Sequence, residues 1–96
     1  MIEIRKTVSF PLGRIVATPE ALKALENAGQ SPAELLDRHR QGDWGEVGGD
    51  DWELNDQALE EGTRILSAYR TKANVRIWII TEADRGSTCL LLPEEY

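Results

Sequence analysis

Apolar and polar residues alternate along residues 2–10, a pattern typical of a strand with one buried face. One face would carry Ile2, Ile4, Val8 and Phe10, and the other Glu3, Arg5, Thr7 and Ser9. Pro11 and Gly13 interrupt the alternation. Residues 14–17 are therefore expected to form either a second short strand or a bent continuation of the first.

Three short helices are predicted next, each from a start signal followed by a narrow apolar stripe. They should cover residues 19–28, 32–40 and 51–61. Thr18 can cap the first helix, and Ser31 and Asp50 each begin a capping box for the other two. A glycine follows each helix and is expected to end it.

From residue 63 the apolar period becomes two, which predicts strands at 64–70, 75–82 and 87–92. Tight turns between them favour a three-stranded antiparallel meander. The predicted fold is one α+β domain over residues 1–96: N-terminal strand or strands, three short helices, then the meander, with the helices on one sheet face. That packing would bury Leu22, Leu25, Leu35, Leu36 and Leu59. Because the helices cover only one face, both a monomer and a sheet-mediated homodimer fit this pattern.

Composition places the chain among soluble globular proteins, with 41% apolar and 29% charged residues in 96 positions. Its single cysteine, Cys89, excludes an internal disulfide and a cysteine-based zinc site. No apolar run approaches the ~20 residues of a membrane span, and the first ten residues lack the apolar core of a signal peptide. A cytoplasmic protein without membrane contact is expected.

The net charge of −6 comes from one stretch, because no lysine or arginine occurs between Arg40 and Arg64. Eight of the 17 acidic residues fall there, which leaves nine acids against 11 bases elsewhere. Such segregated charge attracts basic surfaces and repels nucleic acid. The candidate protein-binding residues are Asp43, Trp44, Glu46, Asp50, Asp51, Trp52, Glu53, Asp56 and Glu60.

The same residues also have a plainer interpretation, because acids near helix N-termini are often only solvated. Trp44, between glycines, either covers the core as a lid or stands out as an interface anchor, and the cost of exposing indole favours the lid. Trp52 is expected to be half-buried against the loop at 42–49. Trp78 lies inside a predicted strand and is expected in the core.

No residue pattern indicates catalysis or a cofactor. Glu82 and Asp84 beside Arg85 resemble a metal or acid–base pair, but turn formation explains them better. His39, the only histidine, is expected to sit as a positive ring at a helix C-terminus. The glycines at 45, 48 and 49 lack the lysine and serine or threonine of a phosphate loop. We therefore expect a protein that is not an enzyme and holds no metal or cofactor.

A basic sheet face is the alternative binding surface, and it would suit nucleic acid. It would combine Arg5, Arg14, Arg64, Arg70, Lys72, Arg76 and Arg85 with Trp78 and Tyr69. The overall acidity of the chain opposes this alternative.

Several blocks of the sequence resemble a family of small bacterial proteins usually labelled plasmid-related or associated with type I restriction systems. The blocks lie at residues 10–19, 28–32, 42–46, 76–85 and 91–96. The resemblance implies a mobile-element setting but no activity or site residues. Together with the acidic stretch, it leads us to expect an accessory protein that binds a basic protein partner, with anti-restriction or anti-CRISPR inhibition as its use. A nucleic-acid-binding regulator is the alternative.

Overall fold

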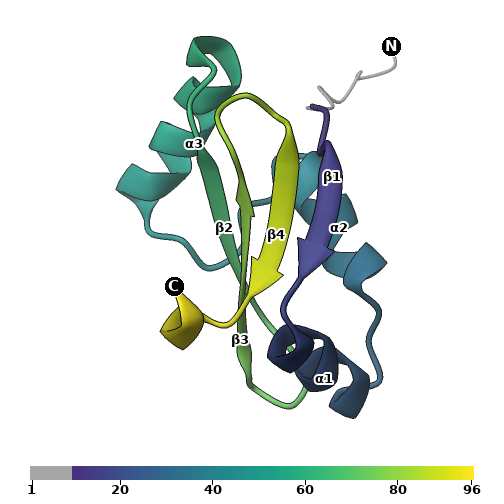
Figure 1. Cartoon of the computed structure of the whole chain (residues 1–96). Coiled ribbons are helices and arrows are strands. Elements are labelled where there is room, and N and C mark those ends of the chain that lie inside the picture. Colours follow the sequence, from purple (N-terminus) through teal and green to yellow (C-terminus); the bar gives the residue numbers. More distant parts are fainter. Residues whose placement is uncertain (1–9) are drawn as a thin grey trace, which may run out of the picture.

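The computed structural model describes residues 10–96 as four strands, three α-helices and a C-terminal 3-10 turn (Figure 1). In chain order these are β1 (Arg14–Ala17), α1 (Pro19–Asn27), α2 (Pro32–Arg40), α3 (Gly49–Glu61), β2 (Ile65–Arg70), β3 (Arg76–Thr81), β4 (Ser87–Leu91) and η1 (Pro93–Glu95). The α+β class and the three predicted helices are confirmed. The strand expected at 2–10 lies outside the described residues except for Phe10, which is buried.

The sheet has four strands in the order β1-β4-β3-β2. Antiparallel pairing joins β2 to β3 and β3 to β4, whereas β1 pairs in parallel with β4, placing Ile15 opposite Thr88. The predicted antiparallel meander is present as β2-β3-β4, but the prediction did not include the parallel fourth strand that makes the sheet mixed. A period of two identifies a strand but does not say which strand lies beside it, and β1 finds its partner more than 70 residues further along the chain.

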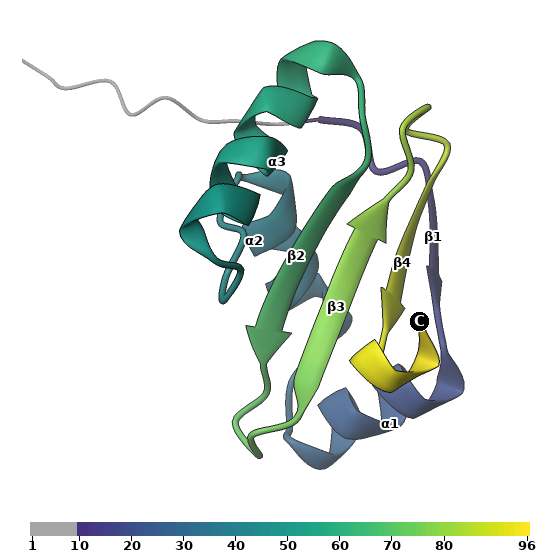
Figure 2. The same ribbon diagram turned by 90° about the vertical axis from the view of Figure 1, so that its left-hand side faces the viewer.

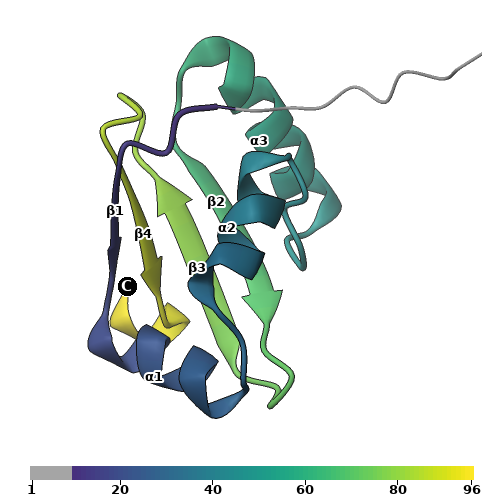
Figure 3. The ribbon, with the colours of Figure 1, turned by 90° about the vertical axis from the view of Figure 1, so that its right-hand side faces the viewer.

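The helices form two groups around this sheet. Helices α1 and α2 cover one face (Figure 3), and α3 runs beside β2 at the edge of the sheet (Figure 2). The core lies under α1 and α2 and includes Leu25, Leu35 and Leu36 as expected, together with Ile77 and Ile79. Among residues 10–96, only η1 packs over the opposite face, at its β4 side (Figure 2).

Two of the five leucines predicted in the core are less buried than expected. Leu22 is 44% exposed, because α1 turns Ala21 and Leu25 toward the sheet and leaves Leu22 at the side of that stripe. Leu59 is half-buried and packs at the margin of the core.

Of the three predicted helix caps, only Thr18 makes its hydrogen bond, with the Ala21 N–H donating to Oγ1 over 3.1 Å. Ser31 precedes α2 without a side-chain bond. Helix α3 begins at Gly49 after Gly48, so Asp50 lies inside the first turn instead of capping it. Its carboxylate still favours the positive end of the helix dipole.

Candidate protein-binding surface

The first part of the acidic stretch is a loop that seals the outer edge of β2. The Ala68 N–H donates to the carbonyl of Trp44 over 3.1 Å, and the Glu46 N–H donates to the carbonyl of Ala68 over 2.7 Å. Gly45, between them, has a φ of +74°, and a β-carbon there would lie 2.0 Å from the Ala68 oxygen. Only glycine permits this close approach, so Gly45 is required for the contact between the loop and β2.

Asn55 of α3 forms hydrogen bonds with the same edge of β2 at Leu66, two residues before Ala68. Its amide nitrogen donates to the Leu66 carbonyl over 2.7 Å, and its amide oxygen accepts from the Leu66 N–H over 3.2 Å. Unpaired strand edges invite association with other strands, and these bonds remove the opportunity here. Asn55 was not among the residues singled out in the sequence. Its position three residues before Ala58, which is buried, places it on the same buried side of α3 and could have indicated this role.

Trp44 is an integral part of the core. It is 0% exposed, packs 6.1 Å from Phe10 and 5.7 Å from His39 between ring centroids, and donates its indole N–H to Asp56 Oδ1 over 2.9 Å. The lid interpretation therefore describes it correctly. Trp44 offers no surface to a partner and leaves the candidate set, and Asp56 is engaged in holding it.

Two further candidate acids are engaged in ion pairs. Asp43 accepts from Arg38 over 2.7 Å, and Glu46 accepts from Arg70 over 3.0 Å. The hydrogen bond from Arg38 lowers the pKa of the Asp43 carboxyl below its ordinary value. Each of these two carboxylates is therefore already paired with an arginine of the same chain.

The remaining candidate acids lie on α3. Asp50, Asp51, Glu53 and Glu60 are exposed, and none of them takes part in an ion pair within residues 10–96. We call these four residues the α3 acidic face. Helix α3 stands at the outer side of the sheet, where a partner can reach it (Figure 1).

Trp52 lies at the start of α3, next to these acids. It is half-buried against the core and lines a depression of about 300 Å³ together with Arg38, Gly42 and Asp43. This is the partial burial that the sequence predicted. Aromatic side chains in such positions commonly supply contact energy at protein interfaces.

His39 belongs to a buried polar network instead of the surface expected for it. Its ring nitrogens contact Ser67 Oγ and, over 2.8 Å, Thr81 Oγ1, and both hydroxyls are fully buried. Burial, and secondarily the charge of Arg85, lowers the pKa of His39 to about 4. The expected positive ring is therefore wrong. The spacing of His39 from Leu35 and Leu36 could have shown that it shares their buried face.

The donors of this network determine the tautomer of His39. Thr88 donates its hydroxyl proton to the Leu12 carbonyl over 2.7 Å, so Thr81 must donate to Thr88. Thr81 then accepts from His39 Nε2–H, which leaves Nδ1 to accept from Ser67. A serine and a histidine in contact suggest a nucleophile and its base, but a substrate cannot reach side chains that are 0% exposed.

The acids at 82–84 serve the turn between β3 and β4. Asp84 accepts from the Gly86 N–H over 2.8 Å, and Glu82 pairs with Arg64 over 3.5 Å. Within residues 10–96, no group of His, Cys, Asp and Glu side chains is arranged to hold a metal ion. The turn interpretation therefore accounts for these residues.

The proposed basic sheet face loses several of its members. Tyr69 is buried on the helix-covered side and donates its hydroxyl to the Asp43 carbonyl over 2.7 Å. Arg85 directs its guanidinium to the carbonyls of Thr63 and Ala58 over 2.6 and 2.9 Å. Arg5 lies outside the described residues.

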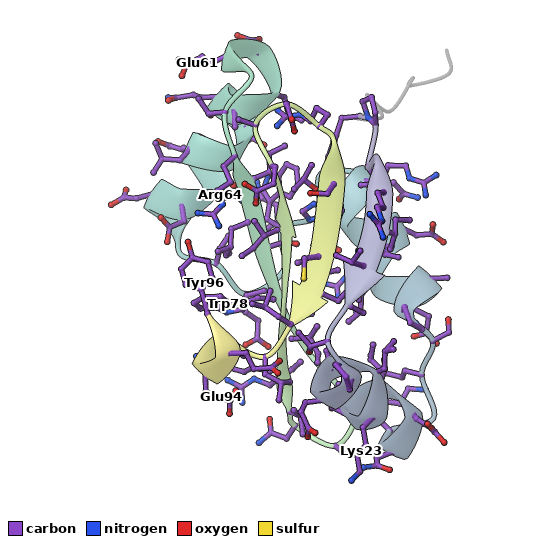
Figure 4. All side chains as sticks on the ribbon, viewed as in Figure 1. Lys23, Glu61, Arg64, Trp78, Glu94 and Tyr96 are labelled. Atoms are coloured by element: carbon purple, nitrogen blue, oxygen red, sulfur yellow. The ribbon has the colours of Figure 1, made fainter. Side chains whose placement is uncertain are left out.

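The arginines that remain on the open sheet face are partly balanced by acids. Arg64 and Arg70 carry the ion pairs already described, and Arg76 lies beside Trp78 on β3. Trp78 is half-buried on this face, with its ring centroid 5.7 Å from that of Tyr96, so the expectation that it lies in the core was wrong. Figure 4 shows Arg64, Trp78 and Tyr96 together on this side of the sheet.

No protein family, curated protein or solved structure matches this chain significantly. Among the described residues, no helix has both the length and the apolar character needed to cross a membrane.

Proposed function

We propose that this protein acts by binding another protein that presents a basic surface, through the α3 acidic face with Trp52 beside it. The observation that supports this proposal is the exposure of four carboxylates on a helix without a single lysine or arginine. Unbalanced charge of one sign raises the association rate with an oppositely charged surface and selects against like-charged ones. The acids that the fold needs for itself are separate from these four.

The biological use that we propose is inhibition of a bacterial defence enzyme, such as a restriction or CRISPR nuclease. Enzymes of this kind hold nucleic acid on basic surfaces, and an acidic helix is complementary to such a surface. The resemblance to plasmid-related and restriction-associated proteins supports the same use.

Affinity capture from a bacterial lysate tests the binding proposal. The test variant combines Asp50→Asn, Glu53→Gln and Glu60→Gln. The control variant combines Glu20→Gln, Glu26→Gln and Glu94→Gln, which removes the same charge from exposed positions outside α3. We expect the test variant to lose proteins that the wild type and the control retain. Identical captured proteins for all three would refute a role for α3.

A restriction assay tests the proposed use. Unmodified phage is plated on bacteria with an active type I restriction system, with and without this protein. We expect expression of the wild type to raise plating efficiency by at least about tenfold, and the α3 test variant to lose that effect. An unchanged efficiency with the wild type would remove anti-restriction from the proposal and leave the capture result unaffected.

Nucleic-acid binding is the competing function, and a gel-shift assay at low salt separates the two. A basic sheet face would shift DNA or RNA, and the shift would weaken steeply as salt rises. We expect no shift, because Arg64 and Arg70 are paired and Tyr69 is buried.

A further inference from the structure

The sheet face opposite α1 and α2 carries a cavity that no described element fills. Ala68 of β2 and Trp78 of β3 are register partners and lie on this face, as does Leu66, the neighbour of Ala68 on the same side of β2. Helix α3 runs along one side of this area, and Tyr96 contacts Trp78 on the other (Figures 2 and 4).

The cavity measures about 200 Å³ and has an apolar floor. Leu66, Ala68 and Trp78 form the floor, and Val47 of the loop before α3 forms a wall. A hollow of this size can receive one aliphatic or aromatic side chain, and burying it there would remove apolar surface from water on both partners.

The rim of the cavity toward α3 is acidic. Asp51 lines it, and Leu54 follows one helical turn later with 59% of its surface exposed. Glu46 also lines it, but its charge is balanced by Arg70, whereas Asp51 has no ion pair within the described residues. Arg76 of β3 also lines the cavity, two residues from Trp78 on the same strand. A ligand that enters from the α3 side therefore meets negative charge beside apolar surface.

We propose that this cavity receives a large apolar side chain of the partner, with a neighbouring lysine or arginine of the same segment bound to Asp51. The inference rests on the proposed function and adds to it the chemistry of the partner: a basic amphipathic segment instead of a merely basic surface. Its contacts extend from the α3 acidic face onto the open sheet face, where the Trp78 indole can also interact favourably with a cation.

Three synthetic peptides of twelve residues test the proposal in titrations of the full chain followed by nitrogen-15 NMR. One alternates arginine and leucine, the second arginine and serine, and the third glutamate and leucine. The three tryptophan indole signals serve as separate reporters: Trp78 for the cavity, Trp52 for the depression near the acidic face, and Trp44 for the core. Substitution of each tryptophan by phenylalanine assigns the signals.

We expect the arginine–leucine peptide to shift the Trp78 indole and the arginine–serine peptide to shift α3 signals without moving Trp78. The glutamate–leucine peptide should shift neither. Binding of both arginine peptides with Trp78 unmoved would overturn this inference and leave the proposed function standing. Absence of binding by both would overturn the two together. A Trp78 shift with the glutamate–leucine peptide would overturn the role of Asp51.

Single substitutions locate the site more closely. Leu54→Ala and Asp51→Asn should each weaken the arginine–leucine peptide by about fivefold or more. The controls Leu22→Ala and Glu20→Gln change an exposed leucine and a first-turn acid of α1, and should leave the affinity unchanged. Equal losses in the controls would contradict the site. A Trp78 signal that moves with protein concentration alone would show that a second copy of this chain fills the cavity, and would overturn the proposal.

Discussion

The loop at residues 43–47 and the exposed side of α3 are similar in composition and differ in what their acids do. In the loop, Asp43 and Glu46 are paired with arginines, and the backbone around Gly45 seals the edge of β2. The four residues of the α3 acidic face are exposed instead, and none of them takes part in an ion pair within residues 10–96. A run of acidic residues in a sequence therefore indicates a binding surface only when the acids that make contacts within the fold are left out of the count.

The two tryptophans of the stretch repeat this contrast. Trp44 is enclosed by Phe10 and His39 and has its indole N–H satisfied by Asp56. Trp52 borders a depression and keeps part of its ring accessible. We therefore expect substitutions in the loop to act mainly on stability, and substitutions at Trp52 and in the α3 acidic face to act mainly on binding.

The largest effect should follow from Trp44→Ala. Removal of a fully buried indole leaves a cavity and removes the hydrogen bond to Asp56, so the free energy of unfolding should fall by about 3–5 kcal/mol. Urea unfolding followed by circular dichroism measures it. A loss below about 1 kcal/mol would show that the loop is not part of the core, and would erase the contrast with α3.

Lowering the pH should reduce the stability of the protein because of His39, which packs against Trp44. Because the folded pKa is about 4 and the ordinary value 6.5, the unfolded chain takes up this proton first as pH falls. The stabilisation is complete above pH 6.5 and declines toward pH 4, for a total of about 3 kcal/mol. Urea unfolding at a series of pH values should show this slope for the wild type and a shallower one for His39→Gln. Equal slopes would contradict a buried neutral histidine.

A smaller loss is expected for Trp52→Ala. Because the ring is half-buried, the free energy of unfolding should fall by about 1–2 kcal/mol, and binding of the captured partner should weaken by more than that. Urea unfolding and calorimetric binding on the same variant provide both numbers. A loss as large as that of Trp44→Ala would place Trp52 in the core and remove the aromatic from the proposed surface.

The smallest expected change in stability comes from substituting a single acid, and one acid from each region is compared. Asp43→Asn removes the ion pair with Arg38 and should cost up to about 1 kcal/mol, since both side chains are partly exposed. Glu53→Gln should leave stability unchanged, because its carboxylate has no partner within the described residues. Thermal unfolding of the two variants side by side measures the difference. A larger loss for Glu53→Gln would indicate that α3 acids serve the fold.

Local pattern determined much of what is observed. The period of two predicted β2, β3 and β4, and the period near 3.6 with its glycine stops predicted α1, α2 and α3. Each end of these six elements lies within two residues of its predicted position. Segregation of the acids is visible in the sequence alone, as is the partial burial of Trp52. These features depend on neighbouring residues, whose relative positions are set by the geometry of a helix or a strand.

Tertiary structure decided the rest. The sequence left open whether residues 14–17 form a separate short strand, and only the folded chain brings β1 beside β4 and places Asn55 against the edge of β2. It also turns His39 into the core, pairs Asp43 and Glu46 with arginines, and leaves the α3 acidic face in solvent. Such contacts join residues far apart in the chain, and their energies depend on burial and partner distance, which no local period encodes.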